Sequence, residues 1–174
     1  MSSGYSSNVI YGNLFKGNSS EQHGGAIKET YYANSKVINN TIIDNEAGYG
    51  GGGIHTGYYA GTLTIKNNII MNNTDSTSLS GNLFLYFGDG RNVDITNNII
   101  QGGYDSIYIY DSDFVGIYEN NLNEDPMFVD PDNDDYSLMC GSPCINTGVN
   151  TPNMPPFDLY GEQRLLGSNV DMGI

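Results

Sequence analysis

The amino-acid sequence predicts an all-β fold, a parallel β-helix in which successive repeats wind into about four to five stacked coils. The chain matches itself at an offset of 27 residues, and short stretches inside each repeat alternate apolar and polar residues. The 174 residues also include 23 Gly and 23 Asn, which are poor in helix and strand interiors and so require many turns. The fold is therefore expected to consist of short strands joined by frequent turns.

The first coils are predicted from the repeat itself. Residues 10–15 align with residues 37–42 without a gap, and residues 24–27 (GGAI) align with residues 51–54 (GGGI). Further copies follow at residues 65–70, 95–100 and 118–122. Self-similarity at a period of about 20–50 residues is typical of a solenoid.

The kind of solenoid follows from the pattern within each repeat. Residues 63–66 (LTIK) and 93–96 (VDIT) alternate apolar and polar side chains, which predicts strands with one buried face. No segment has a convincing helical period of apolar residues. We expect about three short strands per repeat, with each coil about 4.8 Å above the previous one.

A pair of Asn residues marks the same corner of each coil. Asn tolerates the left-handed backbone region better than other non-glycine residues, so it suits a bend between two strands. Stacked at equal height, the amides can also bond to one another as an Asn ladder. We interpret the pair as structural. The second Asn of each pair lies at positions 13, 40, 68, 98 and 121.

One family of strands is predicted to carry the functional face. Alternation points Ile27, Ile54, Leu83 and Ile107 into the bore of the coils. Exposed aromatic rings on a regular sheet can stack on sugar rings while their hydroxyl groups form hydrogen bonds. The alternative is cross-strand stacking that only protects the sheet. The side chains expected to point outward are Lys28, His55, Phe84 and Tyr108 in one column, with Thr30, Gly57, Tyr86 and Tyr110 beside it.

Residues 1–121 are expected to form the coils and residues 122–174 a non-repeating, proline-containing segment. An open end of a β-helix exposes unpaired strand edges, and we expect this segment to be a C-terminal cap over the last coil. The N-terminal coil has no visible cap, which suggests truncation or self-association there, end to end or edge to edge. The apolar residues expected to cover the last coil are Met127, Phe128, Val129, Ile145, Phe157, Leu165 and Leu166.

Acidic residues concentrate near the last coil, where residues 111–135 contain nine of the 20 Asp and Glu. Asp130, Asp132 and Asp134 have the opening spacing of a calcium loop. The Gly and Glu that an EF-hand needs are missing, so a solvated turn is the alternative to a structural calcium ion. No cofactor is expected to be required.

The two cysteines, Cys140 and Cys144, are separated by Gly-Ser-Pro. Such a short loop can close a disulfide if the two Cα atoms come within about 7 Å. Two buried thiols are the alternative, and the sequence does not separate the two interpretations.

Charge and hydropathy exclude several partners. The net charge is −14, with 6 Lys and Arg against 20 Asp and Glu, so too few cations exist to neutralise the phosphates of duplex nucleic acid. No apolar run approaches the roughly 18 residues of a membrane span.

Several motifs resemble those of known families. Residues 24–27 (GGAI) and 15–18 (FKGN) resemble the GGAI and FxxN repeats of chlamydial polymorphic outer-membrane proteins. The Ile-x-Asn-Asn-x-Ile pattern is similar to right-handed parallel β-helix proteins of the pectate-lyase-like superfamily. Residues 125–130, 141–148 and 170–173 resemble the closing segment of secreted bacterial proteins called choice-of-anchor Q. The resemblance implies a right-handed β-helix, an extracellular or bacterial cell-surface location, and a chain that is the end of a longer gene product.

The same resemblance suggests where catalysis would occur. Pectate-lyase-like enzymes carry their substrate groove on the corresponding outer sheet; the lyases use calcium and an Arg or Lys base, and the hydrolases use clustered Asp. The matching candidates here are Lys28, His55, Asp111 and Asp113. Asp111 and Asp113 could act as acid and base on a glycosidic bond, but Asp-Ser-Asp after a strand is also typical of a turn.

The sequence therefore predicts a secreted or cell-surface β-helix module that binds polysaccharide through Phe84, Tyr86, Tyr108 and Tyr110. A polysaccharide lyase or glycoside hydrolase is the first alternative. A non-enzymatic adhesin or structural stalk is the second.

Overall fold

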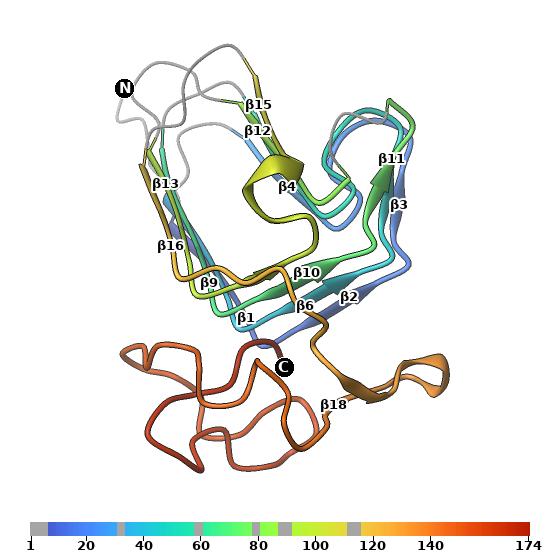
Figure 1. Cartoon of the computed structure of the whole chain (residues 1–174). Coiled ribbons are helices and arrows are strands. Elements are labelled where there is room, and N and C mark those ends of the chain that lie inside the picture. Colours follow the sequence, from blue (N-terminus) through green and yellow to red (C-terminus); the bar gives the residue numbers. More distant parts are fainter. Residues whose placement is uncertain (1–6, 31–33, 58–60, 78–80, 87–91, 111–115) are drawn as a thin grey trace.

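The computed structural model describes residues 7–30, 34–57, 61–77, 81–86, 92–110 and 116–174. The described residues between 7 and 122 wind into stacked coils of parallel strands, and residues 123–174 form an irregular tail beside the stack (Figure 1). Among the described residues, no helix is long and apolar enough to cross a membrane. The predicted parallel β-helix is confirmed.

The first strand of each coil belongs to a five-stranded sheet, here called the long sheet. Its strands are all parallel, and Ile10 pairs with Val37, Val37 with Ile65 and Ile65 with Ile95. Residues that align in the sequence repeat are therefore paired on neighbouring strands. The long sheet contains β1 (Ser7–Tyr11), β5 (Asn34–Ile38), β9 (Thr62–Lys66), β13 (Asn92–Thr96) and β16 (Gly116–Glu119).

The second and third strands of each coil belong to two further sheets. The tail-facing sheet contains β2 (Leu14–Lys16), β6 (Thr41–Ile43), β10 (Ile69–Met71) and β14 (Ile99–Ile100). The short sheet contains β3 (Ser19–Ser20), β7 (Glu46–Ala47) and β11 (Thr74–Asp75). In the fourth coil, the 3₁₀ helix η1 (Gly103–Ser106) lies between β14 and the next strand, and its Tyr104 packs edge-on against Tyr118 with 5.0 Å between ring centroids.

The coil closes with the aromatic sheet, which contains β4 (Ile27–Glu29), β8 (Ile54–Thr56), β12 (Leu83–Tyr86) and β15 (Ile107–Tyr110). Its inward residues Ile27, Ile54, Leu83 and Ile107 are buried in one apolar core with inward residues of the long and tail-facing sheets. This is the inward column that alternation predicted.

The Asn pairs divide two tasks between their members. The first Asn of the pair adopts the left-handed conformation, with φ between 51° and 56°. These residues are Asn39, Asn67, Asn97 and Asn120. The second forms a continuous ladder: Asn13 Nδ2 donates to Asn40 Oδ1 (3.1 Å), and the same bond recurs from Asn40 to Asn68, from Asn68 to Asn98 and from Asn98 to Asn121 (2.9–3.0 Å). Both predicted roles are therefore present, on different residues.

A second ladder lies at the corner between the tail-facing and short sheets. Asn18 donates to Asn45 and Asn45 to Asn73, each at 2.8 Å. Asn73 then donates to Asn82 at 2.9 Å, although Asn82 lies only nine residues further along the chain. Asn82 thus supplies the next level of the ladder. The match of Asn18 with Asn45 at the repeat offset was the sequence signal for this ladder.

The Gly-rich motif lies where neighbouring coils approach most closely. Gly24 and Gly51 have φ of 71° and 73°. A Cβ atom on Gly52 would lie only 2.2 Å from the Thr74 carbonyl oxygen, and the N–H groups of Gly25 and Ala26 bond to the carbonyl groups of Gly51 and Gly52 in the next coil. Glycine is therefore required by backbone packing between coils.

The tail packs against the side of the stack, not across its last coil as the sequence suggested. Its buried residues face the tail-facing sheet in a second apolar core with Ile43, Ile69 and Ile99. Of the predicted covering residues, Phe128 is buried and Ile145 half-buried, while Met127, Val129, Phe157, Leu165 and Leu166 are exposed. The tail residues in the second core are Phe128, Tyr136, Cys144, Met172 and Ile174.

The side chains of the left-handed Asn column hold the tail in place. Asn39 Nδ2 donates to Asp171 O (2.8 Å), Asn97 Nδ2 to Thr147 O (3.3 Å), and Asn67 makes reciprocal 2.9 Å bonds with the backbone of Val149. These Asn side chains reach the tail from the bends between the long and tail-facing sheets. The tail includes one antiparallel hairpin, β17 (Phe128–Asp130) and β18 (Asp135–Leu138), joined by the 3₁₀ helix η2 (Pro131–Asn133).

The first coil is less buried than the central coils. Ile10, Phe15 and Ala26 pack against the core but are only partly buried. Self-association at this coil stays a prediction.

Candidate functional site on the aromatic sheet

The outward residues of the aromatic sheet form the column that the sequence predicted. Lys28 pairs with His55, His55 with Phe84 and Phe84 with Tyr108, each in register on neighbouring parallel strands. Tyr86 pairs with Tyr110 in a second column two residues along. The parallel register therefore brings side chains about 80 positions apart in sequence into one row.

The rings of this row are in contact from coil to coil. The centroid of His55 lies 5.0 Å from that of Phe84, and Phe84 lies 4.8 Å from Tyr108. Tyr86 stacks on Tyr110 at 4.9 Å with 27° between the ring planes. Cross-strand aromatic stacking, the structural alternative for these residues, is thus present.

The middle of the row is covered, which the sequence did not predict. His55 is 6% exposed and Phe84 8% exposed. The ring of His23, from the segment after β3, lies 4.3 Å from that of His55. Gly50 (φ 48°) lies against the ring of Phe84, so closely that a Cβ atom on residue 50 would be 2.2 Å from the ring. A glycine therefore allows the loop before β8 to lie directly on the aromatic ring.

His23 also links the row to Tyr49. Its Nδ1 atom lies 2.7 Å from the Tyr49 carbonyl oxygen, and the two rings lie 5.8 Å apart. Sequence reasoning missed both residues, because neither belongs to a strand. Their 26-residue separation, close to the repeat offset, was the only signal.

Three tyrosines, Tyr86, Tyr108 and Tyr110, form a partly exposed surface at one end of the row, here called the tyrosine patch. Tyr110 is 45% exposed, and Tyr86 and Tyr108 are half-buried. Buried Phe84 supports it from one side, with its ring 6.3 Å from that of Tyr110. The patch is a supported aromatic surface whose hydroxyl groups can donate and accept hydrogen bonds.

The catalytic candidates are only partly brought together. Lys28 is exposed and lies beside His55, whereas the His55 ring is enclosed between His23 and Phe84. Asp111 and Asp113 lie outside the described residues. A proton acceptor must come within hydrogen-bond reach of its substrate, and the enclosed His55 ring is poorly placed to do so.

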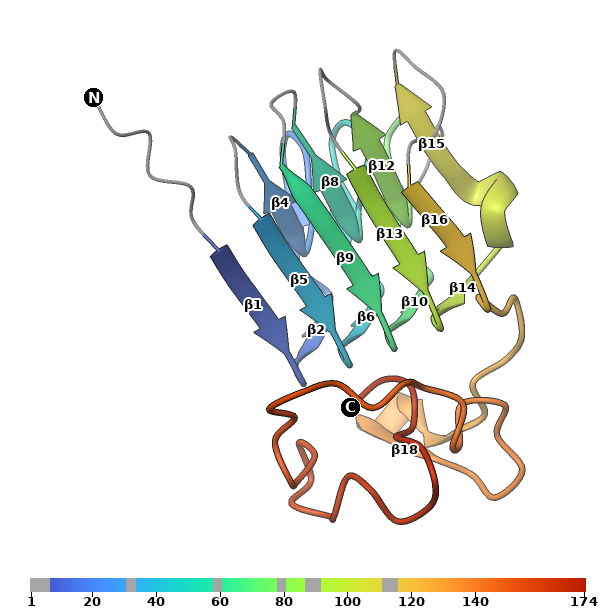
Figure 2. The same ribbon diagram turned by 90° about the vertical axis from the view of Figure 1, so that its left-hand side faces the viewer.

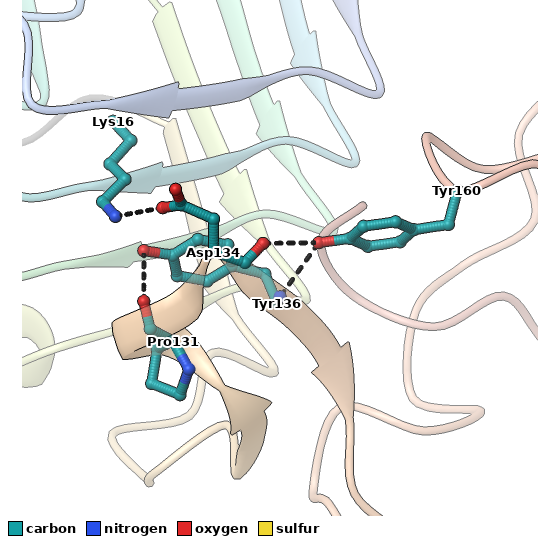
Figure 3. Close-up of polar contacts among 5 residues, drawn as sticks. All are labelled: Lys16, Pro131, Asp134, Tyr136 and Tyr160. Carbon is teal, nitrogen blue, oxygen red and sulfur yellow. Dashed lines mark hydrogen bonds and ion pairs between the residues drawn. The ribbon is translucent and has the colours of Figure 1, made fainter.

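The acidic hairpin of the tail binds a lysine of the coils. Figure 3 shows Lys16 of β2 in an ion pair with Asp134, next to the ring of Tyr136, whose centroid lies 5.4 Å from the Lys16 Nζ atom. The hydrogen bond with Asp134 raises the pKa of Lys16 above its usual value. The Tyr160 hydroxyl accepts a bond from Tyr136 N (2.9 Å), so several groups fix this hairpin (Figure 3).

The predicted calcium ligands lie at different points of this hairpin. Asp134 pairs with Lys16, and Asp130 accepts a bond from Asn133 Nδ2 (2.8 Å). Within the ranges that the structure describes, no group of three or more His, Cys, Asp or Glu side chains is arranged to hold a metal ion. Calcium binding by Asp130, Asp132 and Asp134 stays a prediction.

The two cysteines are free and differ in environment. Cys140 is exposed, and Cys144 is buried in the second core. Burial raises the pKa of the Cys144 thiol to about 12. The thiolate is the reactive form of cysteine. Cys144 is therefore protected from alkylation and oxidation because it is buried and because its thiol stays protonated.

Alkylation with iodoacetamide near neutral pH is therefore expected to modify one thiol per folded chain, at Cys140. Peptide mapping by mass spectrometry identifies the site, and the unfolded chain under non-reducing conditions should take up two labels. Rapid labelling of both cysteines in the folded chain would contradict the buried position of Cys144. A disulfide would prevent labelling in both states.

The sequence was compared with known proteins. The family model described as right-handed beta helix region matches residues 1–124, more than two thirds of the chain. Neither the curated proteins nor the solved structures gave a match. The matched segment covers all the coils and ends where the tail leaves the stack. The chain belongs to the right-handed β-helix family.

Proposed function

We propose that this chain is a secreted or cell-surface module that binds polysaccharide through the tyrosine patch. The observation that carries the proposal is the arrangement of three partly exposed tyrosines on neighbouring parallel strands: Tyr86 stacks on Tyr110 in register, and Tyr108 lies on the same strand as Tyr110. The β-helix fold is suited in general to surface modules of this kind.

The chemistry of the patch fits a sugar chain. Aromatic faces bury the apolar C–H faces of sugar rings, and phenolic hydroxyls bond to sugar hydroxyls. Phe84 and the stacked neighbours hold the rings in place before binding, so little conformational entropy is lost when a ligand is bound. The patch is small, which favours a contact with a few sugar units.

Binding, not turnover, is the activity that the patch supports. On the same sheet, the described catalytic candidates are the enclosed His55 and Lys28, which lies on β4, two strands away from Tyr86. A lyase would release unsaturated products from an acidic polysaccharide, which absorb in the ultraviolet. The proposal expects no such absorbance with or without calcium, and its appearance would replace the binding proposal with the lyase alternative.

Replacing Tyr110 or Tyr108 with alanine is expected to weaken glycan binding about tenfold, because each change removes a ring face from the patch. A glycan array identifies the ligand, and isothermal titration calorimetry measures the affinity. Phe157→Ala is the matched control, since Phe157 is an aromatic residue of the tail that is also exposed.

Thermal unfolding of each variant separates loss of binding from loss of folding. Unchanged affinity in folded Tyr108→Ala and Tyr110→Ala variants would refute the patch as the binding surface. Absence of any ligand for the wild-type chain would favour the structural stalk.

A further inference from the structure

A second candidate site lies on a different face, between the long sheet and the tail. The outer face of the long sheet forms its floor and tail residues 151–155 form its wall, enclosing about 710 Å³. Figure 2 shows the tail passing beside the ends of the long-sheet strands. We call this cavity the tail groove.

The tail groove crosses every strand of the long sheet. Val9 of β1 lines one end and Ile117 of β16 the other, and the register between them runs through Lys36, Thr64 and Asp94. Four strand spacings correspond to about 19 Å. The groove is therefore long enough for a chain of several sugar units lying across the strands.

The wall of the groove is fixed to its floor. Asn67 makes two reciprocal bonds with Val149, both 2.9 Å, two residues before the wall begins. Asn150 accepts a bond from Val170 N (3.0 Å) and donates one to Ser168 O (3.0 Å). Pro152 and Pro155 restrict the backbone of the wall itself. The groove is thus formed before any ligand arrives.

The groove concentrates positive charge on an acidic protein. Lys36 and Lys66 both line it, out of only six Lys and Arg in a chain with net charge −14. Within the described part of the chain neither lysine forms an ion pair. Arg164 lies close by, 5.3 Å from the centroid of the Tyr11 ring. Three of the six cations are therefore at or beside the groove.

The single acidic residue of the lining is already engaged. Asp94 Oδ1 accepts bonds from Asn92 Nδ2 (3.0 Å) and from Ile117 N (3.3 Å). Both donors bond to the same oxygen, and Asp94 forms no ion pair with Lys36 or Lys66. The two ammonium groups remain available to an external anion.

Two hydroxyl groups of the lining have unused hydrogen-bonding capacity. Tyr11 Oη and Thr96 Oγ1 are buried and form no hydrogen bond with the described residues. Buried polar atoms without a partner are rare and need an explanation. Both belong to the column that also contains Lys66, so the unused oxygens and the lysine lie on one line across the strands.

We propose that the tail groove binds a linear glycan that carries carboxylate or sulfate groups. Lys36 and Lys66 pair with the anionic groups, and Val9, Ile117 and the prolines contact the apolar faces of the sugar rings. This site lies on a different face from the tyrosine patch and does not depend on it.

Other polymers fit the groove less well. A peptide strand that adds to a sheet needs a free strand edge, and the middle of the floor, from β5 to β13, consists of strands already paired on both sides. A duplex nucleic acid would be repelled by the net charge of −14 and would find only a narrow cationic strip.

The test compares an oligouronate with its carboxyl-reduced neutral counterpart of the same length, by isothermal titration calorimetry on the full chain. Wild-type protein is expected to bind the oligouronate about tenfold more tightly, and the double variant Lys36→Gln/Lys66→Gln should lose this preference. Added salt should weaken binding of the oligouronate more than that of the neutral chain.

Lys28→Gln is the matched control, since Lys28 is an exposed lysine of the aromatic sheet, outside the groove. It should keep the preference, as should Tyr110→Ala, which separates this site from the tyrosine patch. Equal affinity of wild-type protein for the two oligosaccharides would overturn the proposal. So would an unchanged preference in the folded double variant, or an equal loss in Lys28→Gln.

Discussion

Replacing Asn68 with alanine is expected to lower the free energy of unfolding by about 3–5 kcal/mol, because each buried polar group left without a partner costs about 1–3 kcal/mol. Asn68 is fully buried at the centre of the ladder. Its Oδ1 accepts bonds from both the backbone N–H (2.9 Å) and the Nδ2 (3.0 Å) of Asn40, and its own Nδ2 donates to Asn98 (2.9 Å). Alanine leaves these groups in a core that water does not reach.

Chemical denaturation followed by circular dichroism measures this loss. Asn8→Ala is the control, because Asn8 is exposed on β1, and it should change the stability by less than about 0.5 kcal/mol. Similar small losses in both variants would mean that the ladder does not stabilise the stack.

Replacing Tyr136 with alanine is the second change with a large expected effect, about 3–5 kcal/mol of unfolding free energy. Tyr136 is 1% exposed and is the largest fully buried side chain of the tail core. Its ring packs edge-on against Phe128 with 5.0 Å between centroids. Alanine leaves a cavity between the tail and the tail-facing sheet.

The loss should be accompanied by release of the tail, which limited proteolysis detects. Cleavage between residues 123 and 174 should become faster, while the coils remain protected. Leu166→Ala, at a highly exposed tail position, should have neither effect. A stable, protease-resistant Tyr136→Ala variant would contradict the packing of the tail on the side of the stack.

The sequence predicted the coils well because their determinants repeat. The offset of 27 residues aligned Ile10 with Val37, and the two residues pair in the long sheet. The Asn pairs predicted both the bend and the ladder, although the division between Asn39 and Asn40 needed the backbone conformation. Because the same pattern recurs in every coil, a chance match in one repeat is not mistaken for the fold.

The tail could not be placed in this way because it does not repeat. Its apolar residues suggested a cap, but apolarity does not distinguish the last coil from the side of the stack. The position of the tail is set by close packing and by hydrogen bonds. Gly173, with φ of 86°, allows the backbone to lie against Ile69, and Asn67 forms hydrogen bonds with Val149. Contacts between non-repeating segments leave no period in the sequence.

The sequence predicted which side chains of the candidate site lie next to one another, but not which of them are exposed. Alternation correctly placed Phe84 and Tyr108 on the outer face, yet it treated every outward side chain as exposed. Loops containing His23 and Gly50 cover Phe84, and a period of two residues contains no information about loops. The tail groove was missed for a related reason, since its wall comes from the tail.

The proposal that the outer face of the aromatic sheet binds glycan is tested most directly by mapping the bound ligand on the wild-type chain. In nuclear magnetic resonance titration with the best ligand from the array, the account predicts the largest shift changes at Tyr86, Tyr108 and Tyr110. For an anionic ligand, a second set is predicted at Lys36 and Lys66. Saturable shifts confined to any other surface, or no shift at all with every glycan tried, would contradict it.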